Sequence, residues 1–109
     1  MRQTHALVQV AMALLDDPRG RHWGYGLSRK SGVRSGVLYP ILTRMLDDGW
    51  LTDRWVEAGA VADQRLPRRY YRLTAKGKTQ ATRVLDEART DRRFAALFSE
   101  PEIAKASTE

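Results

Sequence analysis

The stretch Ser35-Gly-Val-Leu-Tyr-Pro-Ile-Leu-Thr-Arg-Met-Leu-Asp-Asp-Gly49 decides the fold of this 109-residue chain. Its large apolar residues recur at intervals of three and four positions, so that they share one face of a helix. They are Leu38, Ile41, Leu42, Met45 and Leu46. Ser35 is suited to cap the start of this helix, and Gly49 ends it after Asp48. The stretch therefore predicts an amphipathic helix whose outer face is free for another role.

A shorter helix is expected immediately before this one, over residues 25–31. Gly32 follows it, at the position where a helix end favours a residue that tolerates positive φ. A short helix, a tight glycine turn and a second helix together form a helix-turn-helix. We expect residues 18–24, ahead of the pair, to form a loop.

The N-terminal segment predicts a helix over residues 5–15, capped by Thr4 and ended by Asp16-Asp17-Pro18. This helix is apolar nearly all round, so it must be covered on more than one side. In a chain this small, we assign part of that cover to a second subunit.

Beyond Gly49 the sequence period changes from 3.6 to 2, and residues 51–57 and 68–73 predict two strands. The connection over 58–67 is longer than a tight turn, so we expect its tip to be mobile. Alternation along the second strand points Tyr71 into the core. We expect Trp50 and Trp55 to be packing residues rather than ligand platforms.

Thr74 is expected to cap a final helix whose apolar stripe is interrupted around Asp91–Arg93. We expect residues 99–109 to form a disordered tail. A hairpin directly after a helix-turn-helix makes a winged helix. The predicted fold class is therefore α+β, mainly α, with a winged helix-turn-helix followed by an additional C-terminal helix.

The net charge of +6 is concentrated in two blocks that contain no acidic residue. Residues 18–46 hold six Arg and Lys residues, and residues 64–85 hold seven. Two basic blocks that alternate with acidic ones favour a polyanionic partner that touches two separate surfaces. The alternative is an arginine-rich surface that serves solubility alone.

The outer face of the second helix is the candidate DNA-reading surface, because its first half is small and uncharged and a major groove admits a helix. On it we expect base or phosphate contacts from Ser35, Val37, Tyr39, Thr43 and Arg44. The flanking helix and turn offer Arg29, Lys30 and Arg34 to backbone phosphates. The hairpin offers Arg65, Arg68, Arg69 and Arg72 to the adjacent minor groove.

Four of these residues also have structural interpretations that compete with a DNA contact. Tyr39 fits a core aromatic with a surface hydroxyl as well as it fits a DNA contact. Arg44 suits a phosphate contact, or pairing with Asp47 or Asp48, better than it suits base readout. Arg69, like its neighbour Arg72, fits the solvated face of a strand.

Several classes of function are excluded by composition. The chain has no Cys, which rules out disulfides and thiolate metal sites. Its two histidines, His5 and His22, have no adjacent nucleophile, carboxylate or metal-ligand spacing, so we expect no enzyme, no cofactor and no metal. No apolar run approaches the ~20 residues of a membrane span, and no signal peptide is recognisable. We therefore expect a cytoplasmic protein without a membrane partner.

Four runs of the sequence, taken together, resemble the PadR family of bacterial transcription regulators. They are Gly24-Tyr-Gly-Leu, Ser35-Gly-Val-Leu-Tyr-Pro, Leu46-Asp-Asp-Gly-Trp-Leu and Arg68-Arg-Tyr-Tyr-Arg-Leu-Thr-Ala-Lys-Gly77. The resemblance extends over residues 4–98, and the chain is similar to the family's short form with a single C-terminal helix. It implies a DNA-binding domain over 1–74 and a dimerisation helix over 75–98.

The resemblance also implies a homodimer that binds double-stranded DNA at a pseudo-palindromic promoter site, usually as a repressor. Some family members bind small hydrophobic or aromatic effectors that loosen the grip on DNA. Dimerisation in the family uses the C-terminal helix packed on the N-terminal helix. The corresponding dimer-interface residues here are Leu7, Val10, Ala11, Leu14, Val84, Leu85, Ala88, Ala95 and Phe98.

A second hypothesis is a winged-helix protein-interaction module whose basic surface docks an acidic protein. The fold alone does not separate the two functions. A preference for one DNA sequence over others would favour the regulator, and equal affinity for every DNA sequence would favour the interaction module.

Overall fold

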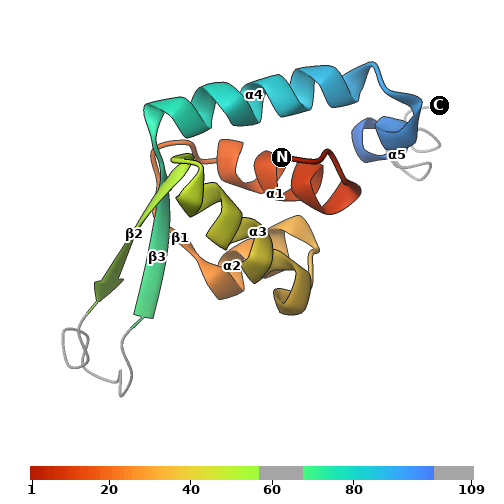
Figure 1. Cartoon of the computed structure of the whole chain (residues 1–109). Coiled ribbons are helices and arrows are strands. Elements are labelled where there is room, and N and C mark those ends of the chain that lie inside the picture. Colours follow the sequence, from red (N-terminus) through yellow and green to blue (C-terminus); the bar gives the residue numbers. More distant parts are fainter. Residues whose placement is uncertain (57–67, 100–109) are drawn as a thin grey trace, which may run out of the picture.

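The computed structural model describes residues 1–56 and 68–99, and Figure 1 shows their arrangement. The predicted mobile tip and all of the predicted tail except Ser99 lie outside the described residues. The elements, in chain order, are α1 (His5–Leu15), β1 (His22–Trp23), α2 (Gly24–Ser31), α3 (Ser35–Asp47), β2 (Leu51–Val56), β3 (Arg68–Leu73), α4 (Ala75–Arg89), the 3-10 turn η1 (Arg92–Phe94) and α5 (Ala95–Phe98).

Helix α1 is the centre of the core. The Thr4 side chain accepts a hydrogen bond from the Leu7 amide at 3.1 Å, which confirms the predicted cap. In Figure 1, α4 runs along one side of α1, and α2 and α3 lie on the other. Leu7, Val10 and Leu14 are at most 2% exposed as a result. The chain itself therefore supplies the cover that was expected in part from a second subunit.

The turn between α2 and α3 is closed by glycine and by serine side chains. Gly32 has a φ of 75°, and its amide donates to the Ser28 carbonyl at 3.0 Å, as expected for a helix end. The Ser28 hydroxyl donates to the Val33 carbonyl at 2.7 Å, and the Ser31 hydroxyl accepts from the Val33 amide at 3.1 Å. These hydrogen bonds fix the angle at which α3 leaves α2.

The start of α3 differs from its prediction. Arg34, with extended backbone, is the cap position, whereas Ser35 is already helical and makes no capping hydrogen bond. The Arg34 carbonyl accepts from both Val37 and Leu38 amides, at 2.9 and 2.8 Å, which starts the helix one residue early. Prediction of Ser35 as the cap was therefore wrong.

The other end of α3 forms a Schellman motif around Gly49, whose φ is 78°. The Trp50 amide donates to the Met45 carbonyl at 2.8 Å, and the Gly49 amide donates to the Leu46 carbonyl at 3.1 Å. Trp50 is 7% exposed, so its predicted packing role is confirmed. The motif turns the chain from α3 directly into the wing.

The wing is part of a three-stranded antiparallel sheet with the order β1-β3-β2. Residues 18–24 are not all loop as predicted, because His22 pairs with Tyr71 and Trp23 with Tyr70. A two-residue strand carries no periodicity, and its partner lies far along the sequence. Trp23 lies 5.3 Å from the Tyr70 ring, so Tyr70 is buried as well as Tyr71.

The wing is joined rigidly to α4. The Thr74 hydroxyl caps α4 by accepting from the Gly77 amide at 2.9 Å, and the Thr74 amide donates to the Trp50 carbonyl at 3.0 Å. Gly77 lies so close to Trp50 that a Cβ at this position would overlap the Trp50 carbonyl. Only glycine therefore fits at this junction without displacement of the backbone.

The C-terminal stretch 75–98 is not one helix. Helix α4 ends at Arg89, and Figure 1 shows the chain turning back through α5 beneath the end of α4. Asp91 accepts from the Arg93 amide at 2.9 Å and pairs with its guanidinium at 2.8 Å, which caps the start of η1. Phe94 then packs under α1, 1% exposed and 4.8 Å from the His5 ring.

Candidate nucleic-acid interface

The outer face of α3 is exposed and almost uncharged. Val37 is 50% exposed and Tyr39 45%, whereas Leu38, Leu42 and Met45 on the inner face are fully buried. Among the other predicted contact residues, Ser35, Thr43 and Arg44 are exposed. Core burial of one face therefore holds the opposite face of α3 free in solvent.

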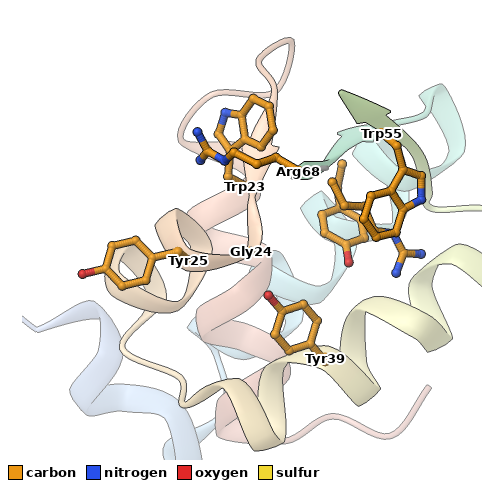
Figure 2. Close-up of a pocket in the computed structure, with 8 residues that line it drawn as sticks. Trp23, Gly24, Tyr25, Tyr39, Trp55 and Arg68 are labelled. Carbon is orange, nitrogen blue, oxygen red and sulfur yellow. The ribbon is translucent and has the colours of Figure 1, made fainter. Parts of the chain in front are cut away.

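Tyr39 is neither a core residue nor an isolated surface residue. Its hydroxyl lies against Gly24 at the start of α2, where a Cβ would overlap it. Figure 2 shows the ring at the border of an open space between α3 and the wing. Tyr39 thus lies where the two predicted DNA-contacting elements meet.

Three of the predicted basic contacts are engaged in ion pairs. Lys30 lies 2.8 Å from Asp16, Arg44 lies 3.2 Å from Asp48, and Arg69 lies 2.6 Å from Asp53. The hydrogen bond from Lys30 and its positive charge lower the pKa of the Asp16 carboxyl. The pairs of Lys30 and Arg44 are exposed, and exposed pairs of this kind are weak and can be exchanged for phosphate. The pair between Arg69 and Asp53 is only about one third exposed.

The remaining basic candidates differ in their surroundings. Arg29 donates to the Tyr25 hydroxyl at 3.4 Å, and Arg72 donates to the Arg19 carbonyl at 3.3 Å. The Arg68 guanidinium lies 4.2 Å from the Trp23 ring centroid. Arg34 is exposed, and no salt bridge involving it occurs within residues 1–56 and 68–99. Arg65 lies outside the described residues.

An open cleft of about 320 Å³ separates α2 and α3 from the inner face of the wing (Figure 2). It is lined by Trp23, Gly24, Tyr25, Tyr39, Trp55, Arg68, Arg69 and Tyr71. Trp55 is 60% exposed, so its prediction as a packing residue was wrong. The strand extends beyond the helices that cover the sheet, which leaves its last large side chain without a core to enter.

A second cavity of about 390 Å³ lies between α1, α2 and α5. Its lining combines apolar side chains with the Lys30–Asp16 ion pair: Gln9, Met12, Ala13, Asp16, Lys30, Ser31 and Leu97. The cavity thus extends from α5 to the end of α2, which is the first helix of the helix-turn-helix.

The predicted dimer-interface residues divide into two groups. Leu7, Val10, Ala11, Leu14 and Ala88 are buried inside the single chain and have almost no area left for a partner. The other four, Val84, Leu85, Ala95 and Phe98, are partly or fully exposed. In this conformation, the packing of α4 on α1 that we expected between subunits occurs within one chain.

Within the described ranges, no three His, Asp or Glu side chains group in a way that could hold a metal ion. The buried His22 has its Nε2 2.8 Å from the Asp17 carbonyl, which is a structural contact. In the part of the chain that the structure describes, no helix is both long and apolar enough to cross a membrane.

Comparison with protein families gives one match. The profile of the transcriptional regulator PadR-like family matches residues 21–83, which include α2, α3, the wing and the first half of α4. Comparison with curated proteins gives no match.

Solved structures with the same fold include several regulators. A PadR family transcription regulator from Clostridium difficile R20291 is 18% identical, with a TM-score of 0.66 over 87% of this chain and 98% of that one. A PadR-like regulator from Bacillus cereus is 23% identical, with a TM-score of 0.59 over 85% and 94%. Bacillus subtilis PadR, solved in complex with operator DNA, is 19% identical, with a TM-score of 0.60 over 94% of this chain and 58% of that one.

Proposed function

Because the family profile spans more than half of its residues, the chain belongs to the PadR-like family of transcriptional regulators, and we propose that it is a dimeric repressor. Members of this family are transcriptional regulators and not enzymes. The proposed repressor binds a pseudo-palindromic promoter site, with one α3 in the major groove of each half-site.

The exposed, uncharged outer face of α3 is the observation that carries the proposal. Val37 and Tyr39 project from it, and Arg44 lies at its edge in an exposed pair with Asp48. An uncharged helix face enters a major groove without repulsion from the phosphates that border it, while the exposed Arg29, Lys30 and Arg34 are available to bind phosphates. Bacillus subtilis PadR, which shares the fold, was solved on operator DNA, and this supports DNA as the partner.

A pseudo-palindromic DNA site requires a dimer, and we assign the contact between the two subunits to the C-terminal segment 75–98. A small cluster of buried residues, Val8, Ala88 and Phe94, is surrounded by partly exposed apolar residues that support this surface: Met12, Val84, Leu85, Leu97 and Phe98. Figure 1 shows α5, which carries two of them, on the opposite side of the molecule from β2 and β3. Two copies joined there would hold two α3 helices about one DNA turn, ~34 Å, or a multiple of it apart.

Release by a small hydrophobic effector is the regulatory part of the proposal. The cavity between α1, α2 and α5 supports it, because Met12, Ala13 and Leu97 offer apolar contacts. Lys30 and Ser31, at the end of α2, line the same cavity. An occupant would therefore touch the helix-turn-helix and the dimerisation segment at once.

The test is selection of binding sites from random duplex DNA with the purified chain, followed by titrations of the enriched site. We expect Tyr39→Phe combined with Arg44→Ala to weaken operator binding by about tenfold or more, since each specific contact contributes about 1–3 kcal/mol. Arg83→Ala, an exposed cation on α4, is the matched control and should bind as the unmodified chain does. Unchanged operator binding in the double variant would contradict the assignment of α3.

A further inference from the structure

We propose that the cleft between α3 and the wing seats one sugar–phosphate strand of the operator, with Trp55 packed on a deoxyribose and Arg69 positioning Trp55. The inference rests on the proposed DNA-binding function and adds a contact residue that composition and periodicity did not indicate. It also changes the role of Arg69 from phosphate ligand to support.

Trp55 is placed for this role by the register of the hairpin. It pairs with Arg69, and Asp53 pairs with Tyr71, so these four side chains share the inner face of the sheet. That face runs from the buried Leu51 and its partly buried partner Leu73 outward to Trp55, which is 60% exposed. The indole therefore continues the inner face of the wing beyond the core, into the cleft.

Arg69 is held from three directions. Its Nε and one terminal nitrogen both approach the same Asp53 oxygen, at 2.7 and 2.6 Å. Its guanidinium lies 5.0 Å from the Tyr71 ring centroid and 5.7 Å from that of Trp55. A guanidinium already matched by a carboxylate adds little net charge toward a phosphate. Its stacked position instead restricts the orientation of the indole.

The other walls of the cleft supply what a nucleic-acid strand needs. Tyr39 borders the cleft from α3, and Arg68, stacked on Trp23, borders it from β3 (Figure 2). Arg68 is exposed, and within the described residues no salt bridge holds it. An aromatic face suits the C–H surface of a sugar, and a free guanidinium suits the adjoining phosphate.

The position of the cleft identifies the occupant. When α3 enters a major groove, the strand that borders this groove must pass between α3 and the wing, because the wing follows α3 directly. Arg68, an exposed cation that lines the cleft, matches the charge of that strand. The cleft is open to solvent and not an enclosed cavity, which also favours a continuous chain over a small molecule.

The experiment measures operator affinity of the full chain as a function of KCl concentration. The variants are Trp55→Ala, Arg69→Gln, both together, and Arg68→Gln. The matched control is Arg54→Gln, which removes an exposed arginine from the same strand one position away from Trp55, on the opposite face. Thermal melting of each variant confirms that the wing remains folded.

We expect Trp55→Ala and Arg69→Gln each to weaken binding by about tenfold, without change in the slope of log K against log salt. The double variant should be no weaker than Trp55→Ala alone, because Arg69 acts through Trp55. Arg68→Gln should instead reduce the slope by about 0.9 for each phosphate that is left without its cation, or twice that in a symmetric dimer. Arg54→Gln should leave affinity for the operator close to that of the unmodified chain.

A second measurement does not depend on affinity. Acrylamide quenches exposed indoles, and operator DNA should protect the unmodified chain from quenching. Protection should be smaller in Trp55→Phe than in the unmodified chain. The buried Trp50 does not contribute to it, and the partly exposed Trp23, which also lines the cleft, accounts for the protection that remains.

Two results would overturn the inference. Trp55→Ala with unchanged affinity and Trp55→Phe with full DNA protection would show that Trp55 does not contact the operator. A reduced salt slope in Arg69→Gln that persists in the Trp55→Ala background would make Arg69 a phosphate ligand. Failure of the proposed function is distinguishable, because the unmodified chain itself would then show no preference for any DNA sequence.

Discussion

Helix α3 and the wing hold their exposed side chains in place by different means. The outer face of α3 is oriented from behind, because Leu38, Leu42 and Met45 are fully buried on its inner face. Wing side chains are instead oriented by neighbouring side chains of the sheet. Asp53 forms an ion pair with Arg69, and the Trp23 ring stacks against the Arg68 guanidinium. Substitution of the buried residues behind the outer face of α3 should therefore destabilise the domain, whereas substitution of the residues that position the wing side chains should change binding and leave the fold intact.

The largest effect is expected where the core holds α3. Leu42→Ala removes a fully buried side chain from the hydrophobic core that α3 shares with α1, so we expect a loss of about 2–5 kcal/mol in the free energy of unfolding. Thr43→Ala, the exposed neighbour, should change it by no more than about 0.5 kcal/mol. Urea denaturation of the two variants measures both values. Equal stability of the pair would mean that α3 is not held by the core.

The junction between the wing and α4 offers the next largest effect. Gly77→Ala places a Cβ on the Trp50 carbonyl, and we expect a loss of about 1–3 kcal/mol in the free energy of unfolding.

Gly26→Ala is its matched control, since nothing lies within 4 Å of a Cβ at that position in α2. Alanine there should stabilise the chain by about 0.5–1 kcal/mol. In thermal melts, we expect Gly77→Ala to lower the melting temperature and Gly26→Ala to raise it, which distinguishes a glycine needed for packing from one that is not. Shifts of the same sign would refute it.

A smaller effect is expected at the turn. Gly32→Ala forces a side chain into the left-handed conformation at φ 75°, which costs about 1–2 kcal/mol. Gly36→Ala in α3 has open space around it and lies within a helix, so it should not destabilise. The two alanine variants, compared by chemical denaturation, separate backbone strain from packing. A cost at Gly36 as large as that at Gly32 would contradict this interpretation of the turn.

The smallest effect concerns the ion pair that connects α1 to α2. Lys30 lowers the pKa of the Asp16 carboxyl in the folded chain. A lowered folded pKa means that the contribution to stability is present above the unfolded pKa and is lost as pH falls below about 4. In Lys30→Gln, the pKa of Asp16 measured by NMR titration should rise toward its ordinary value. An unchanged pKa would show that the pair does not form in solution.

Local signals predicted most of the helix-turn-helix. The apolar spacing of α3, the positive φ of Gly32 and Gly49 and the caps at Thr4 and Thr74 are all present in the structure. Each of them depends on residues fewer than five positions apart. The start of α3 is the exception, because the turn hydrogen bonds of Ser31 and Ser28 set it rather than a cap at Ser35.

Features that depend on distant contacts were not predictable from the sequence. Strand β1 exists through pairing with β3, about 48 positions later, and it buries Tyr70 as a consequence. Trp55 is exposed only because the strand extends beyond its covering helices, and this is not visible in the alternation of residues. The return of Phe94 beneath α1 likewise depends on a contact with His5 at the other end of the chain.

Selection from random duplex DNA at two salt concentrations is the most direct test of the central claim, that α3 and the wing together read an operator. We predict one enriched palindrome whose affinity falls steeply as salt rises. Its half-sites should be centred about one helical turn, or a multiple of one turn, apart. Salt-sensitive binding with equal affinity for every sequence would contradict the claim. It would instead favour an acidic protein as the partner of the basic surface.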